Sequence, residues 1–175
     1  MSYSNPCNII ATDTKWLGAA PRTSRFVNFT DPLFGFRAAT LVLRSYFAHR
    51  RISKLSDVIY TWAPPCENDS ERYLSFVASV LDVSDDYEIA TSDDCARILG
   101  AMAIMENTPD VLRSIHARLS SALDSTSSVS SLSGFGKHFE EVLRKLAFTL
   151  KEPIAMSPQK FVSLIFEIID SYVQM

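Results

Sequence analysis

Two adjacent prolines, Pro64 and Pro65, constrain the fold of this chain more than any other feature. Neither can continue an α-helix, and each favours an extended backbone at the residue before it. The sequence ahead of them has apolar residues at helical spacing, which predicts a helix over about residues 53–62. These apolar residues are Leu55, Val58, Ile59 and Trp62.

Polar residues follow the prolines and can accept hydrogen bonds from the free N–H groups of a new helix, which we predict over about residues 69–82. Two interpretations of this corner stay open. In the first, the corner only turns the chain and Glu67 is solvated. In the second, Glu67, Asn68 and Asp69 stand beside aromatic side chains in a cleft, a common setting for carbohydrate contact or acid/base chemistry.

Helical spacing of apolar residues recurs in five more stretches, so we predict a mainly α fold. These stretches are about 35–49, 93–105, 109–123, 139–150 and 158–173. Two short strands, 8–11 and 25–29, are expected to form a small N-terminal β-hairpin. The Ser-rich residues 125–136 predict a linker between a domain of residues 1–124 and a C-terminal helical pair, 137–175. That pair packs on the domain or on a partner.

Composition and charge exclude several classes of protein. No window has the roughly 20 apolar residues of a membrane helix, and no signal peptide is recognisable. Three cysteines without metal-ligand spacing predict reduced thiols in a protein made in a cytoplasm. Residues 1–66 carry eight Lys or Arg against three acids, whereas the rest carries nine against seventeen. The basic third could face an anionic partner or the chain's own acidic part, but nucleic acid is not the expected partner.

Sequence motifs of common cofactor and metal sites are missing. There is no Gly-rich phosphate loop, no Cys-x-x-Cys and no His-Glu-x-x-His. We therefore expect no cofactor and no metal.

Several short motifs resemble those of small bacteriophage and prophage proteins that are commonly described as virion structural proteins with a lysozyme-like character. The resemblance covers roughly residues 3–107, and its most specific part is the run Trp-Ala-Pro-Pro-x-Glu-Asn-Asp at 62–69. The other motifs are Asn5-Pro6-x-Asn8-Ile9, Trp16-x-Gly18, Phe26-x-x-Phe29, Pro32-x-x-Gly35-x-Arg37-Ala38, Tyr46, Ile52 and the series from Ala101-Met102 to Glu106-Asn107.

A more distant similarity is to bacterial glucosaminidases, in which the catalytic glutamate lies just upstream of the Asn-rich turn. This chain has no glutamate before Glu67. The resemblance thus implies that Glu67 acts as general acid with Asp69 as second carboxylate, or that the activity is lost. It also implies a set of residues that line a glycan groove: Asn5, Asn8, Trp16, Arg37, Trp62 and Tyr73.

Taken together, the resemblance implies a lysozyme-like helical domain in a virion-associated protein that binds or degrades peptidoglycan at the cell wall. The alternative is a structural protein on a degenerate hydrolase scaffold, which contacts other virion proteins through its C-terminal helices. The fold does not decide between the two.

Overall fold

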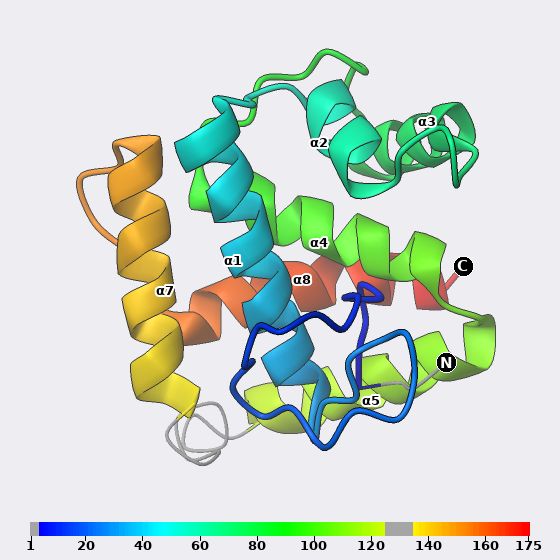
Figure 1. The fold of residues 1–175 in the computed structure, drawn as a ribbon, viewed down its shortest axis with the longest axis vertical. Helices are drawn as coiled ribbons and strands as arrows, with labels where there is room; N and C mark the ends of the chain where they lie inside the picture. Colours follow the sequence, from blue (N-terminus) through cyan, green and yellow to red (C-terminus); the bar gives the residue numbers. More distant parts are fainter. Residues whose placement is uncertain (1–3, 125–134) are drawn as a thin grey trace.

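The computed structural model describes residues 4–124 and 135–175, and the fold of these residues is mainly α-helical (Figure 1). The mainly α prediction is therefore confirmed. The helices, in chain order, are α1 (Pro32–Arg50), α2 (Leu55–Trp62), α3 (Ser70–Leu81), α4 (Ser92–Glu106), α5 (Pro109–Asp124), α7 (Phe135–Leu150) and α8 (Pro158–Val173).

Helix α4 is the centre of the packing. It carries apolar residues nearly all round and is buried over most of its length, as helices of that kind usually are. Helix α8 lies along α4 and α5, and α7 packs against α1. The helices α2 and α3 lie together at one end, and the irregular N-terminal segment runs across one face of α1 (Figure 1).

The double-proline corner has the predicted form. Helix α2 ends at Trp62, and the N–H groups of Glu67 and Asn68 both donate to the carbonyl of Pro64 at 3.0 Å. Asp69 then accepts a hydrogen bond from the N–H of Arg72 at 3.1 Å and caps α3. The corner is thus closed by its own hydrogen bonds.

The predicted N-terminal β-hairpin is not formed as such. In the described residues the two segments meet through a single antiparallel bridge, Ile10 with Phe26, and a second bridge joins Ala19 to Phe29. The side chain of Asn5 explains the interruption, because its Oδ1 accepts from the N–H of Ile9 at 2.9 Å and its Nδ2 donates to the carbonyl of Val27 at 2.8 Å. The side chain thus replaces the direct bond from Ile9 to Val27 with which a longer ladder would continue.

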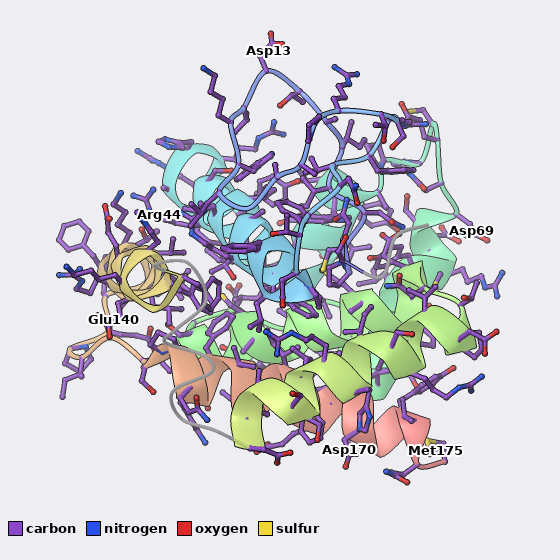
Figure 2. The ribbon with its side chains drawn as sticks, turned by 90° about the horizontal axis from the view of Figure 1, so that it is seen from below. Asp13, Arg44, Asp69, Glu140, Asp170 and Met175 are labelled. Carbon is purple, nitrogen blue, oxygen red and sulfur yellow. The ribbon has the colours of Figure 1, made fainter. Side chains whose placement is uncertain are left out.

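The predicted Ser-rich linker lies mostly outside the described residues, and its last two residues, Phe135 and Gly136, begin α7. The C-terminal helices share aromatic packing with the rest of the chain. The ring of Phe135 lies 5.5 Å from that of Phe34, which precedes the predicted linker. Phe139 packs against Phe135 and Phe161, with ring centroids 5.1 and 5.4 Å apart. Figure 2 shows α7 and α8 beside the other helices.

Helix α8 approaches α4 closely at Gly100. A Cβ atom there would lie 2.9 Å from Cβ of Ile168 and 3.1 Å from the carbonyl oxygen of Ile165. We expect Gly100→Ala to lower the free energy of unfolding by about 1–3 kcal/mol, since overpacking outweighs the better helix propensity of alanine. Urea unfolding followed by circular dichroism would measure it. An unchanged midpoint would mean that α8 shifts freely along α4.

No helix in the described part of the chain is both long enough and apolar enough to cross a membrane.

Candidate functional site

A cleft of about 780 Å³ opens where the double-proline corner, the N-terminal segment and the end of α4 meet. Trp62 and Pro64 line it from the corner, and Asn8 lines it from the N-terminal segment. Two carboxylates lie on its walls, Glu67 and Glu106. With Phe26, Arg25 and Asn68 also on its walls, the cleft combines two aromatic rings, two amides, one arginine and two acids.

Glu106, the last residue of α4, is the less exposed of the two carboxylates in the cleft and is held by other side chains. Its Oε2 accepts a hydrogen bond from Nδ2 of Asn8 at 2.7 Å, and its Oε1 accepts one from the hydroxyl of Tyr73 at 2.9 Å. Burial raises the pKa of Glu106 above its ordinary value, and the hydrogen bonds from Asn8, Tyr73 and Trp62 oppose this shift. Glu106 therefore holds a proton to higher pH than an exposed glutamate does.

The Asn-rich turn is anchored to the end of α4. Asn8 has a positive φ of 51°, a conformation that asparagine tolerates better than most residues. Its Nδ2 also lies 3.3 Å from the backbone carbonyl of Glu106. The side chain of Asn107 donates to the carbonyls of Pro6 and Ala103, each at 2.7 Å. Residues about 100 positions apart in the sequence thus build one wall of the cleft.

Glu67, predicted as general acid, lines the same cleft but is much more open to solvent. Its side chain is 60% exposed and forms an ion pair with Arg25 at 3.1 Å, so the pair joins the corner to the N-terminal segment. Asp69, predicted as second carboxylate, caps α3 and does not line the cleft. The structure therefore brings Glu67 together with Glu106 rather than with Asp69.

A smaller hollow of about 220 Å³ adjoins the cleft, and Asn8, Ile10 and Trp62 line both. We call it the aromatic hollow, because Trp16 and Tyr46 complete its walls together with Trp62. The rings of Tyr46 and Trp62 meet edge to face, with centroids 6.4 Å apart. Flat aromatic surfaces next to carboxylates suit a ligand with both apolar and polar faces.

The other residues predicted for the glycan groove have different places. Asn5 is 2% exposed and bonded to backbone groups, so it holds the N-terminal segment in shape. Tyr73 is 5% exposed and reaches the site through its hydroxyl on Glu106. Arg37 lies beyond Trp16, in a third hollow. The structure thus places Asn8 and Trp62 in the cleft itself and Trp16 in the aromatic hollow.

Glu106 is the site residue that the sequence prediction missed. The signal was present, because Glu106-Asn107 ends a motif of the resemblance. In the glucosaminidases that the chain resembles, the glutamate lies upstream of the Asn-rich turn, whereas in this fold a glutamate from downstream in the sequence lies beside that turn.

No group of three or more metal-ligating side chains occurs among residues 4–124 and 135–175. The fold and the site define a small helical protein whose cleft carries a partly buried glutamate and aromatic walls.

No family model matches this chain. The chain is similar to Protein P5 of Pseudoalteromonas phage PM2, with 32% identity over 82 residues that make up 47% of this chain. The match spans 51% of Protein P5, about half its length. The sequence similarity is thus to a bacteriophage protein.

Proposed function

We propose that this is a bacteriophage virion-associated protein whose cleft binds the glycan strands of peptidoglycan and cleaves them, with Glu106 as general acid. The observation that carries the proposal is the position of Glu106. It has a raised pKa, lies in a cleft with aromatic walls and touches the Asn-rich turn. In the glucosaminidases that the chain resembles, the catalytic glutamate lies next to the corresponding turn in sequence.

The chemistry of the proposed reaction needs one acid that is protonated near neutral pH. Protonated Glu106 gives its proton to the glycosidic oxygen while the bond from that oxygen to the anomeric carbon breaks. A water molecule then bonds to the anomeric carbon and loses a proton, which restores the acid or goes to the second carboxylate. We assign that second role to Glu67, since it is the other carboxylate on the cleft walls.

The similarity to a phage protein supports the association with the virion. Two experiments test the proposal as a whole. The purified protein, incubated with purified cell walls, should release soluble sugar fragments with new reducing ends. Mass spectrometry of purified particles should detect the chain. Intact walls after prolonged incubation would contradict the enzymatic part, and absence from the particle would contradict the virion part.

A structural role is the second candidate, and one observation favours it. The carboxylate of Glu106 ties together the N-terminal segment, α3 and the end of α4, as a purely structural acid would. In that case the protein folds on a hydrolase-like scaffold and contacts other virion proteins. It would bind no glycan, and the wall assay would show no release.

The hydroxyl of Tyr73 offers a test of the acid itself. Its hydrogen bond lowers the pKa of Glu106, so Tyr73→Phe should raise that pKa further. A general acid is active below its pKa and loses activity as the pH rises through it. We therefore expect the alkaline limb of the pH–rate profile to move to higher pH in Tyr73→Phe. Tyr60→Phe, at a partly buried tyrosine of α2 that lines neither the cleft nor the aromatic hollow, is the control and should leave the limb in place. A limb unmoved in both variants would mean that Glu106 is not the titrating acid.

A further inference from the structure

A third hollow, of about 500 Å³, continues the site beyond the aromatic hollow. Trp16 is a wall of both, and Lys15, Arg37 and His138 also line the third one. We call it the cationic hollow. No Asp or Glu lies among the described residues that line it. The hollow is therefore positively charged and connected through shared walls to the cleft that holds Glu106.

In the described part of the chain, the guanidinium of Arg37 lacks a hydrogen-bond partner at one of its nitrogens. Its Nε is buried and has no hydrogen-bond partner within residues 4–124 and 135–175. Burial lowers the pKa of its guanidinium, and the charge of Glu141 on the neighbouring α7 only opposes this shift. Glu141 itself forms an ion pair with Lys145 at 3.0 Å. A guanidinium without a carboxylate partner attracts an incoming anion, because its positive charge is not neutralised by the protein.

The three hollows form a series. Asn8, Ile10 and Trp62 join the cleft to the aromatic hollow, and Trp16 joins the aromatic hollow to the cationic one. A polymer lying in the cleft would pass from the carboxylates over aromatic walls to a cluster of cations. In peptidoglycan every second sugar carries a lactyl group that ends in a carboxylate or in a peptide with carboxylates of its own. A neutral polymer of N-acetylglucosamine carries no such group.

We propose that the cationic hollow binds a carboxylate-bearing substituent of the glycan, so that the protein selects an anionic strand over a neutral one. This inference rests on the proposed glycan-binding function of the cleft. Arg37 holds the carboxylate, and Lys15 adds charge at the rim. The cationic hollow thus determines which class of glycan binds, whereas Glu106 donates the proton in the proposed cleavage.

Binding measurements on the full chain test the inference, with Glu106→Gln as the parent so that ligands stay intact. Three ligands are compared by calorimetry: a peptidoglycan tetrasaccharide with free lactyl carboxylates, the same compound with these carboxylates amidated, and an N-acetylglucosamine tetramer. We expect the free acid to bind about tenfold more tightly than the amide, as one charge-assisted hydrogen bond would give. Arg37→Gln should remove this difference and leave the neutral tetramer unaffected.

Lys160→Gln is the matched control, because it removes one positive charge from an exposed position on α8 outside the three hollows. It should keep the preference for the acid. A fourth ligand, a tetrasaccharide with peptide stems, distinguishes the lactyl carboxylate from the carboxylates of the peptide. If the hollow binds a peptide carboxylate, this fourth ligand should bind most tightly of the four.

The possible failures are distinguishable. If the parent binds the acid and the amide equally well, or if Arg37→Gln weakens all ligands alike, the inference is overturned although the cleft binds glycan. If the parent and the wild-type chain bind none of the ligands, the proposed function falls as well.

Discussion

Replacing Glu106 by glutamine should lower the rate of wall cleavage by about 10²–10⁴-fold, the usual contribution of a general acid. Glutamine has nearly the same size and can still accept one hydrogen bond from Asn8 or Tyr73, but it has no acidic proton to give. The rate of release of new reducing ends from purified walls measures the effect. Circular dichroism of the variant shows whether the fold is kept.

Glu67→Gln is the matched variant at the other carboxylate that lines the cleft. Because Glu67 is exposed and paired with Arg25, we expect its replacement to reduce the rate less than Glu106→Gln does. If Glu67→Gln lowers the rate more than Glu106→Gln does, Glu67 is the general acid, as the sequence alone predicted. Equal activity of all three proteins would exclude both carboxylates from the reaction.

Phe139→Ala should produce the largest loss of stability, about 3–5 kcal/mol. Phe139 is fully buried in α7 and packs between the rings of Phe135 and Phe161. A loss of this size is a large part of the stability of an ordinary domain. Urea unfolding, followed by circular dichroism and by tryptophan fluorescence, measures it.

Phe148→Ala is the control on the same helix. Its ring is 84% exposed, so we expect the free energy of unfolding to change by no more than about 0.5 kcal/mol.

Circular dichroism and tryptophan fluorescence together also test the predicted domains, because both tryptophans, Trp16 and Trp62, precede the predicted linker. A shared core requires that Phe139→Ala lowers the fluorescence midpoint too. A fluorescence midpoint that stays in place would show that the C-terminal pair unfolds as a separate unit.

The helices could be predicted from the sequence because their apolar spacing and caps are local signals. The corner at 62–70 is the clearest case, since Pro64 and Asp69 act on their immediate neighbours. The N-terminal hairpin was predicted from alternating apolar residues, but the amide of Asn5 bonds both the N–H of Ile9 and the carbonyl of Val27 in place of the direct bond between them. That competition depends on residues 22 positions apart, so no local pattern shows it.

The site could be predicted only in part for the same reason. Asn8, Trp16 and Trp62 were found through motifs near them in sequence. Glu106 was not predicted, because its partners Asn8 and Tyr73 are 98 and 33 positions away in the sequence. In addition, the glutamate follows the Asn-rich turn in this chain, whereas it was expected before the turn. Packing of α4 through the middle of the fold is what brings them together.

The contact between Asn8 and Glu106 has a consequence for the proposed activity. Glu106, the proposed proton donor, sits at the end of the central helix and Asn8 sits near the start of the chain, so no fragment that lacks either one can hold the proposed centre. The proposed wall cleavage would then require that the N-terminal segment has docked on the end of α4.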